Sequence, residues 1–264
     1  MDELNNNFEP EEELRFTDKI VGVLTEPSNL FSKLSGEPVK TMDWLLPLLL
    51  SILAGVISLF VLMGDPEIRL NTQEKQMEKM EENFQEMVDK GQLTQAQADE
   101  QLEKTQEMMD KGGYMQLVFG SIGVIIGGVI VFFIIAGVFF LLAKFALGGE
   151  GNFQASMLAY GMPHYIAVIQ IIAIIIASLT MKEILQDTSV GSLLDISKET
   201  LTGWFMYKLD ILSIWFYCVV GIAYAKMFKS ENTIKYIIAI LGLWLGFSLL
   251  FFFIGKAVPF LNFF

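Results

Sequence analysis

The sequence contains few of the residues from which most active sites are built. Its 264 residues include one cysteine, Cys218, and one histidine, His164. A single cysteine excludes an intrachain disulfide, and a single histidine excludes an HExxH zinc motif. No serine lies in a G-x-S-x-G turn, and no G-x-x-x-x-G-K-S/T phosphate loop is present. The sequence therefore predicts a protein that is not an enzyme and has no catalytic, cofactor-binding or metal site.

Positive charge is also scarce, because 18 Lys and Arg stand against 30 Asp and Glu, a formal net charge of −12. An acidic chain repels the phosphates of nucleic acid, so nucleic acid is not an expected partner. Most of the acidic residues lie in two polar stretches, residues 1–43 and 64–114. The first stretch lacks the basic region and short apolar run of a cleavable signal, so we expect the first apolar block to direct insertion.

The sequence is rich in long apolar blocks, and 53% of its residues are hydrophobic. A helix needs about 20 mostly apolar residues to cross roughly 30 Å of hydrocarbon. Strands of a membrane barrel would alternate in polarity, whereas residues 122–142 are apolar on every side. The sequence predicts an all-α polytopic membrane protein with five transmembrane helices. We place the spans at residues 44–63, 115–147, 158–180, 207–228 and 234–254, with a four-span bundle over 115–255 and a tail at 256–264.

The N-terminal arm, residues 1–43, contains one short amphipathic helix. Phe16, Ile20, Val23 and Leu24 recur at helical spacing, and Pro27 ends the pattern. Two placements remain open for this helix. It lies in the lipid interface, or it packs against the protein's own spans.

Residues 64–114 predict an acidic helical hairpin outside the membrane, between the first two spans. One stripe contains Met77, Met80, Phe84, Met87 and Val88, and the facing stripe contains Ala98, Leu102, Thr105 and Met109. Gly91 marks the turn, and Thr94 with Gln97 forms a capping box. The methionine-rich seam seals the two helices together, or residues 72–111 offer an adaptable surface to a protein partner. Copper capture by thioether sulfur is a third alternative, although no Cys or His accompanies it.

The third predicted span contains the most polar and irregular cluster in any span. Pro163 lacks an N–H group and predicts a kink. Tyr160 and His164 are four residues apart, so an unbroken helix would place them on one face. The cluster is a candidate ligand or partner site. The alternative is an interfacial aromatic belt around one internally hydrogen-bonded histidine.

Asp210 is the best candidate for an ionisable residue at the edge of a span, five residues before Trp215. Charged side chains within spans are costly and often mark solute or ion paths. We expect Asp210 to pair with Lys208 or with a neighbouring helix. Asp210 and Trp215 therefore join the candidate partner or ligand site, and the alternative is a structural role.

Two pairs of glycines predict close helix packing. Gly123 with Gly127, and Gly242 with Gly246, each form a small-x-x-x-small ridge that lets two backbones approach. The contact is either within the chain or between copies in a homo-oligomer.

Three segments together carry a family resemblance. They are FTDKIVGVLTEPSNLF at residues 16–31, GEGN at 149–152 leading into AYGMP at 159–163, and DILSIW at 210–215 followed by GIAY at 221–224. In these segments the chain resembles the Ypt-interacting protein (YIP) family of five-span membrane proteins, in its bacterial form. In eukaryotes the resemblance implies Golgi and endoplasmic reticulum proteins that bind prenylated Rab-type GTPases. Bacterial relatives lack that machinery, and the acidic hairpin departs from the compact family pattern.

These observations favour a non-enzymatic scaffold or partner-binding protein in membrane organisation or trafficking. The alternative is a transporter or channel for a small solute or ion. An odd number of spans places the termini on opposite sides of the bilayer. Lys226, Lys229 and Lys235 flank the short turn at 229–233, which favours a cytoplasmic location for that turn and for the N-terminus. We expect the membrane to be a bacterial inner membrane.

Overall fold

The computed structural model describes residues 14–257, apart from the side chains of residues 108–114 and 116. Residues 1–13 and 258–264, which include the start of the predicted arm and most of the predicted tail, lie outside it, as do the side chains of Met109 and Lys111. All regular secondary structure in the described part is helical. In chain order the helices are α1 (Phe16–Thr25), α2 (Pro27–Leu34), α3 (Thr41–Gly64), α4 (Pro66–Asp89), α5 (Gln95–Leu141), the π-helical turn η1 (Leu142–Ala146), α6 (Phe153–Gly161), α7 (His164–Met181), α8 (Val190–Leu193), α9 (Leu201–Lys208), α10 (Ile211–Met227) and α11 (Thr233–Ala257).

Four segments are long and apolar enough to cross a membrane, and a bent pair of helices makes a fifth if the pair forms one span. The four are Thr41–Gly64, Leu117–Ala146, Phe153–Met181 and Thr233–Lys256. The pair is α9 with α10, which meet at an angle of 65°. The span predicted over 207–228 covers the end of α9 and all of α10, and the sequence did not predict the break between them. A new helix starts after Asp210, because its side chain accepts a hydrogen bond from the backbone N–H of Leu212 and caps α10.

The third span is interrupted where proline predicts it. The last residue of α6 is Gly161 and the first of α7 is His164, so Met162 and Pro163 separate the two helices. Proline has no N–H to donate to the preceding turn. The backbone continues through a tight turn in which Ile166 donates to the carbonyl of Pro163 at 2.8 Å.

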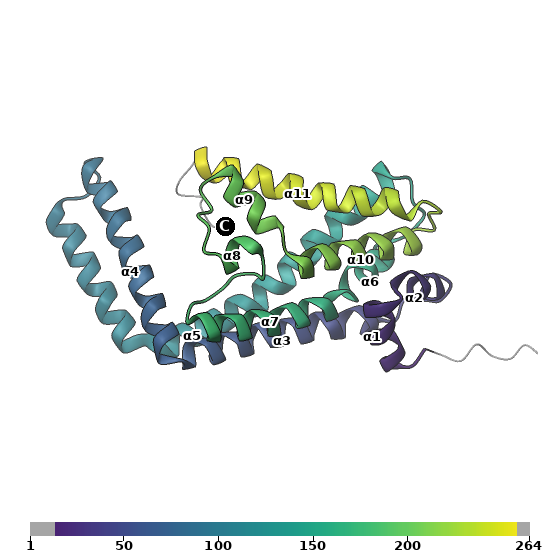
Figure 1. Ribbon diagram of the computed structural model, residues 1–264, viewed down its shortest axis with the longest axis horizontal. Coiled ribbons are helices and arrows are strands. Elements are labelled where there is room, and N and C mark those ends of the chain that lie inside the picture. The colour runs from purple at the N-terminus through teal and green to yellow at the C-terminus, as the bar shows by residue number, and fades with distance from the viewer. Residues whose placement is uncertain (1–13, 258–264) are drawn as a thin grey trace, which may run out of the picture.

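The helices α4 and α5 leave the bundle side by side (Figure 1). We call α4 and the part of α5 before residue 108 the α4–α5 hairpin. Gly91 takes a positive φ of 70° in the turn, and Thr94 forms a capping box with Gln97. The 47 residues of α5 extend about 70 Å. One continuous helix therefore serves both the hairpin and the second span.

The seam of the hairpin is covered only in part. Ala98 is 2% exposed, and Met77, Met80 and Phe84 are half-buried, whereas Met87 is 37% exposed. The methionine stripe is thus half-buried over most of its length and exposed at Met87.

The N-terminal helices pack against the bundle (Figure 1). Val23 and Phe31 are fully buried, and α2 lies against α10. Phe16 and Val21 nevertheless remain half or more exposed. One face of α1 therefore packs on the protein, while apolar side chains on another face stay uncovered by the described residues.

The helices approach one another most closely at glycines other than the predicted ones. A Cβ atom on Gly221 would lie 2.6 Å from the Cα of Ile237 in α11, and one on Gly161 would lie 2.9 Å from the carbonyl oxygen of Trp44 in α3. By contrast, a Cβ on Gly123, Gly127, Gly242 or Gly246 would meet no atom of the described residues within 4 Å outside its own helix and neighbours. The two predicted ridges therefore do not mediate close packing within the described chain, and their role between copies stays a prediction.

Substituting Gly221 should separate α10 from α11. The added methyl group of Gly221→Ala meets backbone rather than a flexible side chain, so we expect a loss of about 1–3 kcal/mol of stability. Gly242→Ala, which meets nothing, is the matched control. Thermal unfolding in detergent measures both, and equal melting temperatures for the two variants would contradict this packing.

Candidate functional site

Four of the five candidate residues within the spans, Tyr160, Pro163, His164 and Asp210, fall into two separate groups. Tyr160 and His164 meet at a ring-centroid distance of 5.0 Å, and the edges and faces of Phe132 and Phe216 surround the imidazole at 5.6 and 5.5 Å. The His164 Nδ1 atom lies 3.0 Å from the carbonyl oxygen of Tyr160. Because a carbonyl only accepts, Nδ1 donates the hydrogen in this bond. The histidine is thus internally hydrogen-bonded, and Pro163 starts the helix that carries it.

The rings around His164 belong to the protein core. Phe132 is 1% exposed, Tyr160 6% and Phe216 8%. Phe132 also stacks on Trp44, with ring centroids 5.5 Å apart. The cluster joins α3, α5, α6, α7 and α10, so the rings around His164 are packed inside the bundle.

The second group surrounds Asp210, whose side chain is 2% exposed at the break between α9 and α10. One carboxylate oxygen accepts from the Thr188 hydroxyl at 2.8 Å and from the Leu212 N–H at 3.0 Å. The other accepts from the Gln170 side-chain amide at 2.7 Å and from the Ser213 hydroxyl at 2.8 Å. We call these residues the Asp210 cluster. It connects α7, the segment before α8 and α10.

Lys208 is not the partner of Asp210 that the sequence suggested. Its ammonium group lies over the ring of Trp244, 5.7 Å from the centroid. The neighbouring helix α7 supplies the partner instead, through Gln170. That glutamine could have been suspected as an isolated amide within an apolar block. Trp215 belongs to neither group and packs half-buried against the core.

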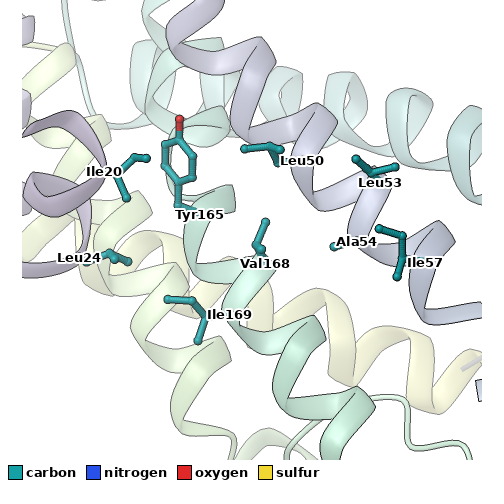
Figure 2. A pocket seen from close by; sticks show the side chains of 9 residues that line it. All are labelled: Ile20, Leu24, Leu50, Leu53, Ala54, Ile57, Tyr165, Val168 and Ile169. Carbon is teal, nitrogen blue, oxygen red and sulfur yellow. The ribbon is translucent and has the colours of Figure 1, made fainter. Parts of the chain in front are cut away.

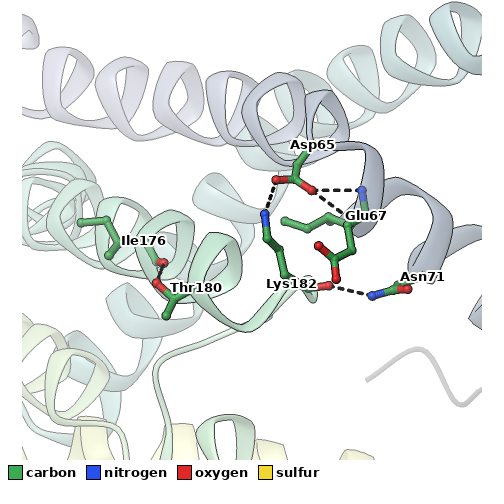
Figure 3. A network of polar contacts seen from close by, with 7 residues as sticks. Asp65, Glu67, Asn71, Ile176, Thr180 and Lys182 are labelled. Atoms are coloured by element: carbon green, nitrogen blue, oxygen red, sulfur yellow. Dashed lines mark hydrogen bonds and ion pairs between the residues drawn. The ribbon is translucent and has the colours of Figure 1, made fainter.

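A third group of polar residues lies at the base of the hairpin, where α3 becomes α4 (Figure 3). Asp65 caps α4 by accepting from the N–H groups of Glu67 and Ile68. The Lys182 ammonium lies 2.6 Å from the other oxygen of Asp65, and the Asn71 amide donates to the Lys182 carbonyl at 3.0 Å. Lys75 pairs with Glu183 at 3.0 Å. We call this group the hairpin clasp, because it ties α4 to the end of α7.

The clasp shifts the pKa values of its two central groups. The hydrogen bond from Lys182 is the main reason that the pKa of Asp65 falls below its ordinary 3.8, and the N–H of Ile68 adds to it. The same hydrogen bond raises the pKa of Lys182 above 10.5. A lowered carboxylate pKa means that the contact is fully formed above pH 3.8 and is lost as pH falls through the lowered value. The raised pKa of Lys182 means that the contact persists up to pH 10.5 and is lost above it.

None of these groups has the composition of a metal site. Among the described residues, no three His, Cys, Asp or Glu side chains gather where they could hold an ion. The carboxylates of Asp65 and Asp210 are already occupied by protein donors.

Taken together, four apolar helical segments long enough to cross a membrane, with a bent pair as a candidate fifth, define a polytopic α-helical membrane protein. The family model described as the Yip1 domain matches residues 21–255, from α1 to α11, and the chain belongs to this family. The YIP resemblance seen in the sequence is thereby confirmed. No curated protein and no solved structure gives a significant match to the chain.

Replacing Asp210 by asparagine should weaken the junction of the bent span. The new NH2 group would face donors on Gln170, Thr188, Ser213 or Leu212, so at least one donor loses its acceptor. We expect a loss of about 1–3 kcal/mol in stability. Glu199→Gln removes one charge from an exposed residue and is the control. Chemical denaturation measures both, and an unchanged midpoint for Asp210→Asn would show that the cluster does not hold the bend.

Breaking the clasp should loosen the hairpin without melting it. Asp65→Asn keeps a good helix cap but loses the charge that Lys182 needs. Spin labels at Gln92 and Glu199, in a chain lacking Cys218, measure the distance between the hairpin turn and the bundle. At neutral pH we expect a broader distance distribution in Asp65→Asn than in the parent protein. In the parent protein the distribution should broaden only below pH 3.8, where Asp65 takes up a proton. Glu100→Gln breaks the Lys104 pair within one helix and should change nothing. Identical distributions for all three proteins would contradict the clasp.

Proposed function

We propose that this protein is a non-enzymatic YIP-type scaffold that binds a protein partner through the α4–α5 hairpin. The observation that carries the proposal is the clasp. Asp65, Asn71 and Lys75 tie the first turns of α4 to the end of α7 at Lys182 and Glu183. A hairpin held at its base presents its surface in a fixed direction, which lowers the entropic cost of binding.

The free surface of the hairpin is acidic and polar. Glu78, Glu81 and Glu82 are exposed on α4, and Glu100 and Glu103 are exposed on α5. Of the apolar side chains of the hairpin, Ala98 is buried and Met77, Met80 and Phe84 are half-buried, whereas Leu70 and Met87 are exposed. A surface of this kind favours a partner with a basic face, with electrostatics contributing mainly to specificity and association rate.

The proposed orientation places the hairpin on the side of the membrane opposite to the N-terminal helices. The backbone N–H of Glu150 donates to the carbonyl of Phe228, so the loops after η1 and after α10 share one end of the bundle with α2. Lys226, Lys229 and Lys235 lie at that end. By the positive-inside rule it faces the cytoplasm, and we propose a bacterial inner membrane as the location.

The alternative of solute or ion transport has no observation in its favour. A path for ions would need buried polar groups that are free to exchange partners. The buried carboxylate of Asp210 accepts four hydrogen bonds from the protein. A homo-oligomer formed through Gly123 and Gly127 is compatible with the scaffold role, because that ridge is open.

Photo-cross-linking in cells tests the partner surface. A photoreactive residue at Glu81 should give a defined adduct, and the pair Glu78→Lys and Glu82→Lys should reduce its yield several-fold because the charge complementarity is reversed. Substitution is preferable to deletion of the hairpin, because α5 continues into the second span.

The control is Glu231→Lys, a charge reversal at the opposite end of the bundle. It should leave the adduct unchanged. An adduct that survives charge reversal on α4, or that forms equally from Leu194 on the bundle, would refute the hairpin as the binding surface.

A further inference from the structure

An apolar groove of about 360 Å³ opens between α1, α3 and α7 (Figure 2). Ile20 and Leu24 of α1 close one end. The stretch of α3 from Leu50 to Ile57 forms one wall, and the stretch of α7 from Tyr165 to Ile169 forms the other. Tyr165 is the only lining residue with a polar side-chain atom. The groove therefore offers almost nothing to a water-soluble ligand.

The position of the groove within the bilayer follows from its two walls, because both α3 and α7 belong to membrane spans. The charged end of the α3 wall is marked by Asp43, which pairs with Lys19 of α1 at 2.6 Å. From Asp43 to Ile57 is about 21 Å along the helix. Half of the hydrocarbon layer is about 15 Å thick. The part of α3 that lines the groove, from Leu50 to Ile57, covers about the inner 10 Å of that distance. The groove thus runs from α1 toward the middle of the bilayer.

We propose that this groove is a binding site for one acyl chain of a membrane phospholipid, with the headgroup beside α1. Leu50, Leu53 and Ile57 contact the chain from α3, and Val168 and Ile169 contact it from α7. The site differs from an ordinary lipid-facing surface because Ile20 and Leu24 of α1 enclose the acyl chain at the end where it enters. The binding energy comes from packing aliphatic groups against a preformed surface.

A transmembrane helix of a partner or of a second copy fits the groove poorly. Helices in membranes associate mainly through small residues or interhelical hydrogen bonds. The lining has one small residue, Ala54, and its other residues apart from Tyr165 are Ile, Leu and Val.

Photoactivatable lipid tests the site. The full chain is reconstituted into vesicles of phosphatidylethanolamine and phosphatidylglycerol, doped with phosphatidylglycerol that carries a diazirine near the middle of one acyl chain. Adducts should concentrate on peptides containing residues 50–57 and 168–169, several-fold above the exposed lipid-facing residues 119–130 of α5. Equal labelling of all lipid-facing segments would overturn the proposal, because it is the pattern of annular lipid.

Filling the groove supplies the decisive variant. Ala54→Trp should lower labelling of the opposite wall, residues 168–169, several-fold while labelling of α5 stays constant. Ile134→Trp places the same ring at a lipid-exposed position of α5 and should leave the groove labelled. If Ala54→Trp does not purify as a monodisperse protein, Ile169→Trp fills the groove from the other wall, and labelling of residues 50–57 becomes the readout. Undiminished groove labelling in a folded filling variant, or cross-links between two copies through residues 50–57, would contradict an acyl-chain site.

Discussion

The need to satisfy polar groups inside hydrocarbon governs the whole structure. A straight apolar helix meets this need by itself, since its backbone groups bond within the helix. Where a span departs from a straight helix, other hydrogen-bond partners must replace those that the helix would have supplied. At the bend between α9 and α10 the substitute is the Asp210 cluster, in which donors from three segments surround one carboxylate. Among the described residues, no buried side-chain nitrogen or oxygen is left without a partner. The bend in this chain is thus stabilised by specific hydrogen bonds to Asp210.

The same principle acts at the membrane surface, with a different outcome. Where α3 leaves the bilayer, the Asp65 carboxylate caps α4 and pairs with Lys182 at the end of α7. This contact ties the base of the hairpin to the bundle. At the other end of the bundle, Lys19 and Asp43 join α1 to the start of α3. These two ion pairs hold α1 and α4 at opposite ends of the bundle. We propose that the acidic hairpin at one end binds a protein and that the apolar groove beside α1 at the other end binds a lipid.

The sequence predicted those parts of the fold that depend on local chemistry. Five apolar blocks gave the spans, Pro163 gave the interruption of the third, and the Thr94–Gln97 box gave the start of α5. The bend before Asp210 could not be predicted, because it contains neither proline nor glycine and depends on Gln170 and Thr188, which are distant in the sequence. For the same reason the candidate site residues separated into two groups. Tyr160 and His164 are four residues apart, so their contact could be predicted from the sequence. Gln170 is 40 residues from Asp210 in the sequence, so that contact could not be predicted.

The account depends most on the bent pair α9–α10 being a complete crossing, because this places the turn before α11 on the face opposite to the hairpin. Labelling of single cysteines with a membrane-impermeant maleimide, in a chain lacking Cys218, measures this directly. Gln92→Cys in the hairpin turn and Glu231→Cys in the turn before α11 should react from opposite sides of the membrane. Reaction of both from the same side would mean that α9 and α10 form a re-entrant loop, and would contradict the account.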